Sequence, residues 1–417
     1  MFNTIDEAVS WIESVKKFGD KLDLSRMELA CSILGNPEKK LPVIHIAGTN
    51  GKGSTVSYLK HILLEAHYNV GTFTSPYIVR FNERITYNNN DISNEELLQY
   101  INEVKELHDR VLDKHNQVIT FFELITLISF MYFRDLDVDF VLYEVGLGGS
   151  LDATNVVSPL ITLITSISFD HMGVLGNTLE EIALNKLGIV KENAPLVTAV
   201  DDVELLKLFR KYTDDVQSDL HIIDEKQITE ISYGSQTNFT YNNNDYIIKM
   251  LGTHQVKNAV LAIEVINQLS NMGKLSIDLI DVQQGLFKTF WPGRLERFGN
   301  VILDGAHNVG GVQALKDSMN VLFKDHYIKV LFTSMADKEY KNNIEIIESI
   351  ADEMHFTTFD YPRCETAVNL FEASNHNLKF IQQDAIAALN ELKELKDNEI
   401  LLVTGSLYFI SYIRKAL

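Results

Sequence analysis

The residues best suited to chemistry lie where a short apolar run meets a helical pattern, in Gly48-Thr49-Asn50-Gly51-Lys52-Gly53-Ser54-Thr55. Glycines allow backbone N–H groups to approach a polyanion, and the start of a helix adds unpaired N–H donors and a positive dipole end. A lysine in such a turn reaches the outer phosphates of a nucleotide, and a neighbouring hydroxyl ligates magnesium. The segment therefore predicts a phosphate-binding loop. A tight turn without a ligand is the alternative, because Ile46 replaces the first glycine of the common spacing.

Polar side chains also follow three other apolar runs. Ser75 follows the first of these runs, Glu144 ends the second, and Asp170-His171 follows the third. Ligands of open α/β sheets bind beyond the carboxyl ends of the strands. Carboxylate oxygens suit magnesium, and neutral imidazole is also a metal ligand. Each residue alone also fits ordinary turn chemistry, but together they predict a metal site.

Two further places carry reactive side chains. Lys186 has apolar neighbours that predict partial burial, and a lysine held away from water reacts more readily as an amine. A solvated helix lysine is the alternative. Asp304 and His307 lie at a predicted strand-to-helix turn, and Lys338 and Arg363 follow later strands, so these turns predict ligand loops or ordinary turn chemistry.

Apolar periodicity predicts the elements that position these residues. Helices are expected over 4–17, 26–34, 53–67, 93–114, 120–133, 178–190, 254–269 and 275–289. Fully apolar strands over 138–143 and 160–167, with a short strand at 71–74, predict a parallel sheet buried on both faces. We expect a long functional loop over 75–91 and a few antiparallel strands over 219–250.

A composition change at Trp291-Pro292-Gly293-Arg294 predicts a domain boundary. Five short β-rich runs separated by helices follow it, which is typical of a doubly wound domain. The fold class is therefore α/β. It comprises an N-terminal P-loop ATPase-type domain with a mostly parallel sheet, residues 1–293, and a smaller C-terminal Rossmann-like domain, residues 294–417.

The composition excludes several classes of partner. A net charge of −20 opposes binding to nucleic acid and to anionic membranes. The chain contains no apolar stretch long enough to span a membrane, and its start resembles no secretion signal. Cys31 and Cys364 are expected to be reduced, so we expect a cytoplasmic protein.

Taken together, the motifs resemble the folylpolyglutamate synthase/dihydrofolate synthase family of the Mur ligase superfamily. The resemblance covers nearly the whole chain, and its motifs occur in order. The motifs are Gly48-Thr49-Asn50-Gly51-Lys52-Gly53-Ser54, Thr74-Ser75-Pro76, Arg80-Phe81-Asn82-Glu83-Arg84-Ile85, Glu144-Val145-Gly146-Leu147-Gly148-Gly149, Leu151-Asp152-Ala153-Thr154-Asn155, His254-Gln255 with Asn258-Ala259, Trp291-Pro292-Gly293-Arg294-Leu295-Glu296, Asp304-Gly305-Ala306-His307-Asn308 and Thr404-Gly405-Ser406-Leu407-Tyr408.

The resemblance implies an ATP-dependent ligase that adds L-glutamate to a reduced folate, and also to dihydropteroate. The substrate carboxylate would attack the γ-phosphate of ATP and form an acyl phosphate, from which the amine of glutamate displaces phosphate. Phosphorylation supplies the leaving group that a carboxylate lacks, and catalysis would rest on cations and backbone donors. The implied cofactors are two Mg²⁺ ions, with ATP as a substrate, and a monovalent cation is allowed. The expected partners are small molecules, and we expect a monomer.

The resemblance also implies roles for individual residues. Lys52, Lys186 and His307 would be catalytic, and Lys186 would react with carbon dioxide to form a carbamate. The ATP-binding residues would be Asn50, Gly51, Lys52, Gly53, Ser54, Thr55, Asn258, Arg294 and Asp304. The metal ligands would be Ser75, Glu144 and His171. The substrate-binding residues would be Ile119, Thr120, Phe121, Phe122, Leu151, Asp152 and Ala153, with residues 1–293 carrying the folate loop and residues 294–417 forming the glutamate ligase domain.

Three positions depart from the family pattern. Ser150 replaces the usual arginine, Val309 a frequent proline, and Asn185 an acidic neighbour of the reactive lysine. None of the three removes a proposed metal ligand, but one positive contact is lost at Ser150.

Two alternative functions differ in kind. A peptidoglycan-precursor ligase would need a nucleotide-sugar domain before the phosphate loop, and only 47 residues precede Gly48. A nucleotide-binding regulator without ligase activity would need the loop but not Glu144, His171 and Lys186 together. The choice between dihydropteroate and reduced folate as acceptor stays open.

Overall fold

The structure, a computed structural model, describes residues 1–16 and 23–417. The chain forms two compact units, and neither is a single continuous segment. Unit 1 comprises Met1–Ile167, His171–Ile223 and Leu261–Gly285, and unit 2 comprises Ser168–Asp170, Asp224–Val260 and Leu286–Leu417. The three residues Ser168–Asp170 therefore belong to unit 2 although both of their flanks belong to unit 1.

Unit 1 contains an eight-stranded sheet in the order β4-β3-β2-β5-β1-β6-β7-β8, in which all neighbours are parallel except β3 with β2 and with β4. The strands are β1 (Val43–Ala47), β2 (Val70–Phe73), β3 (Ile85–Tyr87), β4 (Asn90–Asp91), β5 (Phe140–Glu144), β6 (Pro159–Ile164), β7 (Leu196–Thr198) and β8 (Leu220–Ile222). Every residue of β1 and β5 is buried, which confirms the predicted parallel sheet covered on both faces.

Helices cover this sheet through two apolar clusters. One cluster joins α1, α2, α4 and α5 to β1, β2 and β5, and the other joins α7 and α8 to β6 and β7. The elements are α1 (Ile5–Ser14), α2 (Ser25–Ile33), η1 (Pro37–Lys40), α3 (Lys52–Glu65), η2 (Phe81–Arg84), α4 (Asn94–His115), α5 (Phe121–Arg134), η3 (Ala153–Val156), α6 (Met172–Leu175), α7 (Leu179–Leu187) and α8 (Val203–Asp215). Capping boxes at Thr4, Ser93 and Thr178 start α1, α4 and α7. The predicted end of the first helix, residue 17, lies outside the described residues.

Two predictions for unit 1 were wrong. Residues 75–91 are not one long loop, because η2, β3 and β4 lie within them and β3 pairs with β2. A buried hydrogen bond between the hydroxyls of Thr72 and Thr86, 2.6 Å apart, joins the two strands. Leu220–Ile222 is not antiparallel either, since β8 pairs in parallel with β7. With β7 and β8 only three residues long, neither strand leaves a periodic signal of its own.

Unit 2 contains a six-stranded sheet in the order β12-β13-β17-β14-β15-β16, which is parallel apart from the edge strand β12. Helices α11 to α13 pack on one face, and α14 with α15 pack on the other. The elements are β12 (Glu296–Phe298), β13 (Val301–Asp304), α11 (Val309–Leu322), β14 (Tyr327–Phe332), α12 (Tyr340–Glu348), β15 (Glu353–Thr357), α13 (Ala367–Ala373), β16 (Lys379–Gln382), α14 (Ala385–Leu392), β17 (Glu399–Thr404) and α15 (Leu407–Arg414). The five predicted β-rich runs are strands, and the structure adds β12.

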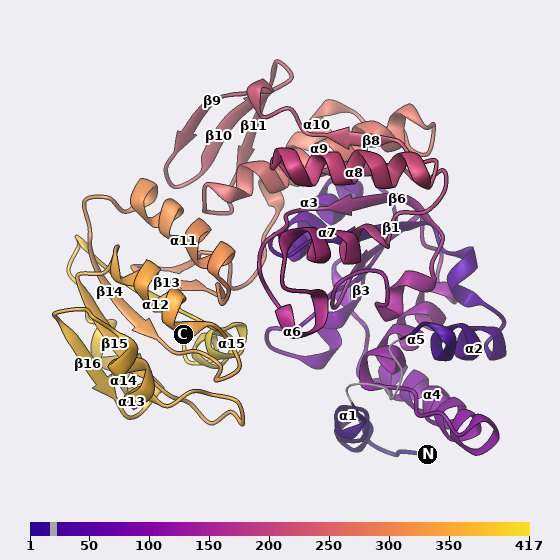
Figure 1. Cartoon of the computed structure of the whole chain (residues 1–417), viewed down its shortest axis with the longest axis horizontal. Coiled ribbons are helices and arrows are strands. Elements are labelled where there is room, and N and C mark those ends of the chain that lie inside the picture. Colours follow the sequence, from indigo (N-terminus) through magenta and orange to yellow (C-terminus); the bar gives the residue numbers. More distant parts are fainter. Residues whose placement is uncertain (17–22) are drawn as a thin grey trace. The chain divides into compact units, whose positions relative to one another are not determined.

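The rest of unit 2 is an antiparallel sheet in the order β11-β10-β9, which Figure 1 draws as a separate group of arrows. The elements are η4 (Glu225–Gln227), β9 (Ile228–Tyr233), β10 (Thr237–Tyr241) and β11 (Asn244–Ile248). This confirms the antiparallel prediction for the second part of 219–250. The helices α9 (His254–Asn271) and α10 (Leu279–Lys288) follow, and each has residues in both units.

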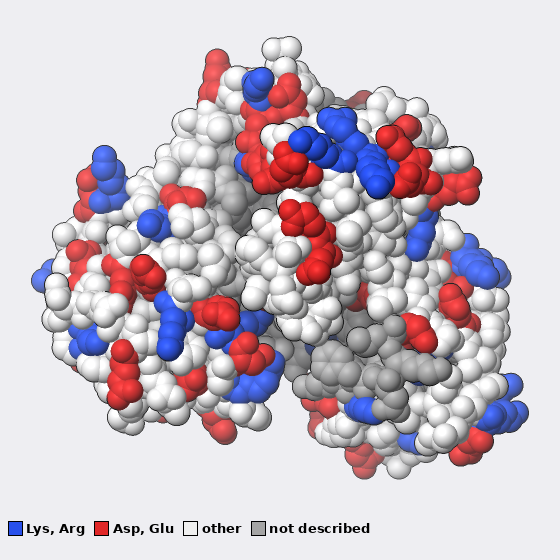
Figure 2. All heavy atoms as spheres, in the orientation of Figure 1, with Lys and Arg blue, Asp and Glu red and all other residues white. Residues whose placement is uncertain are grey.

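One face of the molecule shows how acidic and basic side chains are arranged. On the face drawn in Figure 2, acidic and basic side chains are interspersed among uncharged ones. With a net charge of −20, an anionic ligand must therefore be held by local donors. Among the described residues, no helix is both long and apolar enough to cross a membrane.

Candidate active site

The phosphate-loop segment connects β1 to α3, as its residue types predict. Gly48 has φ 142°, and a Cβ at this position would lie 1.9 Å from Thr165 Oγ1, so a larger residue does not fit. Gly51 has φ 89° and forms the N-cap of α3 without a side-chain cap. The N-cap of α3 is therefore a glycine that brings no side chain to the first turn of the helix, and a glycine turn leading into a helix start is the arrangement that binds phosphate.

Two lysines contact the same backbone oxygen in this loop. Lys52 Nζ donates to Gly48 O at 2.9 Å and to Thr49 O at 3.2 Å, and Lys186 Nζ donates to Gly48 O at 3.1 Å. Lys186 is only 4% exposed, which rules out the solvated alternative. Two amino groups on one oxygen lie within about 6 Å of each other, so they disfavour each other's positive charge.

The glycine loop after Glu144 packs against the end of α7, the helix that contains Lys186. A Cβ on Gly149 would lie 2.7 Å from Asn185 O and 2.9 Å from Lys186 Cα, so the two backbones approach too closely for a side chain. Both the backbone N–H and the hydroxyl of Ser150 donate to Asn185 O at 2.8 Å. The serine that replaces the family arginine therefore ties the loop to the end of α7.

The structure brings two of the three predicted metal ligands together. Glu144, at the end of β5, is 5% exposed, and its Oε2 accepts a hydrogen bond from Ser75 N at 3.1 Å. His171 is exposed and is the N-cap of α6, with φ 50°. Among the described residues no three His, Cys, Asp or Glu side chains form a metal-binding group. Magnesium bound with a nucleotide needs only one or two protein oxygens, because phosphates and water supply the others, and the Glu144–Ser75 pair fits that requirement.

The predicted substrate segments meet at the same glycine loop. The Phe122 ring lies where a Cβ of Gly146 would be, with its Cζ 2.3 Å from that position. Asp152 is buried and accepts from Leu147 N at 2.8 Å. Among the remaining predicted substrate residues, the structure buries Ile119, Thr120 and Ala153, half-buries Phe121 and leaves Leu151 exposed.

Arg294 lies in the turn before the C-terminal sheet, and Asp304 is the last residue of β13 in that sheet. Asp304 Oδ2 accepts from Leu295 N and Oδ1 from Ala306 N, both at 2.9 Å. Burial raises the pKa of Asp304, against the opposing effect of the Arg294 guanidinium and of these two amides. Arg294 Nη1 lies 2.9 Å from the position of a Cβ on Gly305, so the guanidinium covers that glycine. The predicted residue Asn258 is buried on α9, where its amide donates to Gln255 Oε1 at 3.0 Å.

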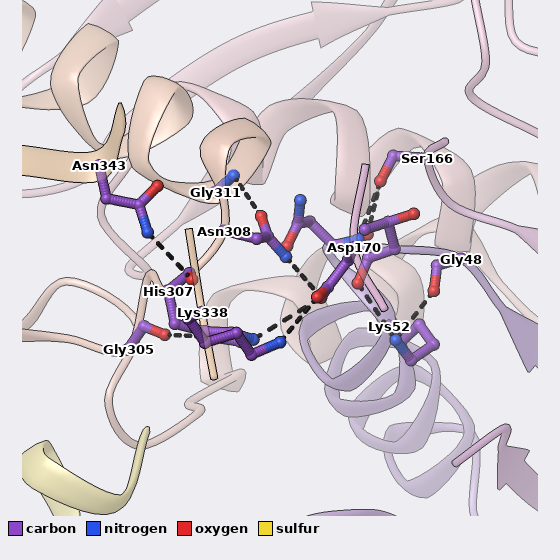
Figure 3. A network of polar contacts seen from close by, with 12 residues as sticks. Gly48, Lys52, Ser166, Asp170, Gly305, His307, Asn308, Gly311, Lys338 and Asn343 are labelled. Atoms are coloured by element: carbon purple, nitrogen blue, oxygen red, sulfur yellow. Dashed lines mark hydrogen bonds and ion pairs between the residues drawn. The ribbon is translucent and has the colours of Figure 1, made fainter. Parts of the chain in front are cut away.

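A polar network in unit 2 centres on Asp170 (Figure 3). The carboxylate accepts from Lys338 Nζ at 2.7 Å and from Asn308 Nδ2 at 2.9 Å, and its Oδ2 lies 3.8 Å from His307 Nε2. Asn308 Oδ1 in turn accepts from Gly311 N at the start of α11, which fixes the orientation of the amide. Sequence reasoning included Asp170 only with His171 among the strand-end residues of the predicted metal site, and it gave Asn308 no role of its own. The only signal for Asp170 was its position beside His171 after a strand.

His307 has a defined proton. Its Nδ1 lies 2.8 Å from the carbonyl oxygen of Gly305, which only accepts, so Nδ1 carries the hydrogen. Burial, with the positive charge of Lys338, lowers the pKa of His307 to about 4, although Asp170 acts in the opposite direction. The imidazole is therefore neutral near pH 7, and Nε2 is a hydrogen-bond acceptor on the side of Asp170.

Both parts of the chain match known domains. The sequence pattern of the Mur ligase middle domain matches residues 46–266, and that of the Mur ligase glutamate ligase domain matches residues 293–407. The α/β fold, the phosphate loop and these two matches define a Mur ligase.

Individual relatives narrow the class. The chain is 44% identical to the dihydrofolate synthase/folylpolyglutamate synthase of Bacillus subtilis, over all of both chains, and 30% identical to the folylpolyglutamate synthase of Lacticaseibacillus casei, over 99% of this chain and 98% of the other. The folylpolyglutamate synthase structure from Thermotoga maritima matches with TM-score 0.85 at 28% identity, covering 99% of this chain and 96% of the other. E. coli FolC in complex with DHPP and ADP matches with TM-score 0.86 at 25% identity, covering 99% and 97%. The chain belongs to the folylpolyglutamate synthase/dihydrofolate synthase family, and it is a ligase.

Proposed function

We propose that this protein uses ATP to join L-glutamate to the carboxylate of a reduced folate, and also to that of dihydropteroate, through an acyl phosphate. The observation that carries the proposal is the convergence of Lys52 and Lys186 on Gly48 O, in a chain whose relatives are named for these two activities. ATP supplies the driving force, since a carboxylate does not react with an amine until it gains a leaving group.

In the first step the substrate carboxylate attacks the γ-phosphate of ATP and releases ADP. The residues of unit 1 that bind the triphosphate are the loop amides of Asn50 to Thr55 and the Lys52 ammonium. In unit 2, Asn258, Arg294 and Asp304 bind the nucleotide, with Arg294 balancing phosphate charge. Positive charge and fixed N–H donors stabilise the negative charge that the transferring phosphoryl group carries.

Magnesium fits the oxygen donors in unit 1. Glu144 and Ser75 would hold it together with the phosphates, with His171 as a further ligand, and it would neutralise charge on the phosphates. Glu144 is buried, and the N–H of Ser75 fixes one of its oxygens, so the carboxylate is already oriented for a cation.

Lys186 fits the proposed carbamate. Reaction of its neutral amine with carbon dioxide forms an N–C bond and releases one proton. The product keeps one N–H, which still donates to Gly48 O. The change replaces a positive charge near Lys52 with a negative one, so the repulsion between the two lysines becomes an attraction.

In the second step the ammonium group of glutamate gives one proton to the neutral His307 Nε2, and the amine attacks the acyl carbon. The bond from this carbon to the phosphate oxygen breaks, and the second proton leaves with the phosphate. His307 Nε2 and the Asp170 carboxylate are two acceptors 3.8 Å apart, which suits the ammonium group of an amino acid. Lys338 suits one of its carboxylates. We propose that these three residues of unit 2 receive glutamate, with His307 in contact with the amine.

His307→Asn tests this assignment. Asparagine keeps an N–H near Gly305 O but has no acceptor in the place of Nε2. We expect the KM for glutamate to rise about tenfold or more, the cost of a lost hydrogen bond to a charged group, while the KM for ATP and for folate stays within twofold. Steady-state kinetics with each substrate varied in turn shows whether the KM for glutamate rises while the other two KM values stay unchanged. An equal rise in all three KM values would contradict the role.

The activity itself is tested with purified protein, ATP, magnesium and labelled glutamate, using dihydropteroate and tetrahydrofolate in separate assays. We expect labelled product from both acceptors, with one phosphate released for each glutamate joined. Phosphate release without any dependence on acceptor and glutamate would instead indicate a nucleotide-binding regulator. The functional domains 1–293 and 294–417, the monovalent cation, the monomeric state and the cytoplasmic location remain predictions.

A further inference from the structure

A buried chain of polar side chains lies beneath the proposed substrate segment in unit 1. His45 is on β1, fully buried, between Ile44 and Ile46, which are also fully buried. Its Nε2 lies 2.8 Å from Thr154 Oγ1, and this hydroxyl lies 2.6 Å from Asp152 Oδ1. A histidine inside an apolar strand is unfavourable unless its polar atoms are used, so these contacts need an explanation.

The direction of each hydrogen bond follows from the acceptors. Both oxygens of Asp152 accept backbone N–H groups, Oδ1 from Thr154 and Oδ2 from Leu147, which favours the ionised carboxylate, whereas burial acts in the opposite direction and raises the pKa of Asp152. With Asp152 as the ionised acceptor, the Thr154 hydroxyl gives its only proton to Asp152 Oδ1 and accepts from His45. This places the imidazole hydrogen on Nε2.

The remaining nitrogen of His45 supports the same tautomer. Burial lowers the pKa of His45 to about 3, with a smaller effect from Lys191, so the ring is neutral and carries one hydrogen. Nδ1 is buried and makes no hydrogen bond, as expected of the nitrogen without a proton. A buried nitrogen without a hydrogen bond destabilises the fold. The ring nitrogen that does form a hydrogen bond is Nε2, and its partner is Thr154.

The hydrogen-bonded chain His45–Thr154–Asp152, the relay, ends at the loop where the substrate segments meet. Asp152 Oδ2 holds Leu147, three residues after Glu144, and the neighbouring Gly146 lies against the Phe122 ring. A loop that this carboxylate fixes and that lies against an aromatic ring suits a flat heterocycle such as a pterin. The position of this carboxylate depends on Thr154, and the orientation of the Thr154 hydroxyl depends on His45.

We propose that His45 and Thr154 are positioning residues that fix Asp152 for binding the pterin part of the folate or pteroate substrate. The inference rests on the proposed function. Neither residue touches substrate, and each acts through the next member of the chain His45–Thr154–Asp152. The relay is therefore expected to affect binding of the folate or pteroate substrate, but not binding of ATP or glutamate.

Paired substitutions test the relay. Thr154→Val and His45→Leu remove the hydrogen bonds, whereas Thr154→Ser keeps the hydroxyl and His45→Gln keeps an N–H donor at the place of Nε2. We expect the first two to raise the KM for dihydropteroate and for tetrahydrofolate about tenfold, with the KM values for ATP and glutamate within twofold of wild type. The conservative variants, Thr154→Ser and His45→Gln, are expected to keep most of the wild-type affinity for these two substrates. Binding of dihydropteroate, measured by calorimetry without turnover, follows the same order.

Thr213→Val is the matched control. Thr213 is buried on α8, and its hydroxyl donates to Phe209 O and Arg210 O of the same helix, so the variant loses a buried hydroxyl that does not belong to the chain His45–Thr154–Asp152. It is expected to lower Tm without changing any KM. The inference is overturned if Thr154→Val and His45→Leu behave like Thr213→Val, or if they raise all three KM values equally.

A second measurement reports the tautomer of His45 in the wild-type protein rather than the kinetics of a variant. Nitrogen-15 NMR of the wild-type protein, with His45 assigned by its loss in His45→Gln or His45→Leu, reports which ring nitrogen carries hydrogen. A hydrogen on Nε2 supports the relay, and a hydrogen on Nδ1 overturns it. Failure of the wild-type enzyme to use either acceptor would instead refute the proposed function.

Discussion

Replacing Lys52 with alanine is expected to lower kcat by about 10³-fold or more while the protein stays folded. Lys52 begins α3 and is only half-buried, and the structure shows it donating to the carbonyls of Gly48 and Thr49. In the proposed reaction the same ammonium balances charge on the phosphates. Its loss therefore affects the transition state far more than it affects folding.

The measurement is single-turnover formation of acyl phosphate and of amide, together with Tm. Lys207→Ala is the control, because Lys207 is an exposed lysine on α8 that pairs only over the surface with Glu204. We expect Tm to change little in both variants and kcat to fall only in the first. A Lys52→Ala enzyme with wild-type kcat would show that the phosphate loop takes no part in the reaction.

Replacing Lys186 is expected to have the second largest effect, and the choice of residue distinguishes two explanations. Lys186→Arg keeps a positive charge but cannot form a carbamate, and Lys186→Ala removes the side chain. If the carbamate is required, both lower kcat by about 10²-fold or more, since each loses one electrostatic contact to the reacting centre. A small acid such as formate then restores part of the activity of Lys186→Ala, because it supplies the missing carboxylate.

The readouts are kcat in the presence and absence of formate, and the mass of the intact wild-type protein after trapping of the carbamate. Full activity of Lys186→Arg would show that the positive charge alone matters. Lys186 lies in a tight place, with Gly149 packed on its backbone, so Tm is measured for every variant. A fall in Tm with no partial recovery by formate would indicate a packing role instead.

The sequence was most informative where the chemistry is local. The phosphate loop needs glycines at particular backbone conformations, and Gly48 and Gly51 indeed have positive φ. Helix starts at Thr4 and Ser93 were predicted correctly because a capping box involves only neighbouring residues. The same reasoning failed for residues 75–91, since a three-residue strand that pairs with β2 depends on a partner outside the segment.

Sequence alone therefore determined the class of fold, the loop that suits phosphate and the polar residues that end its strands. Only the tertiary structure decided which of these side chains share a neighbour. Lys52 and Lys186 meet at Gly48 O although Lys186 is 138 residues from that glycine, and Asp170 contacts Lys338, 168 residues away. His45 and Thr154, 109 residues apart, contact each other because their elements belong to one folded unit. Periodicity and caps act over a few residues, whereas long-range contacts depend on strand order and on how closely backbones pack, which no local pattern encodes.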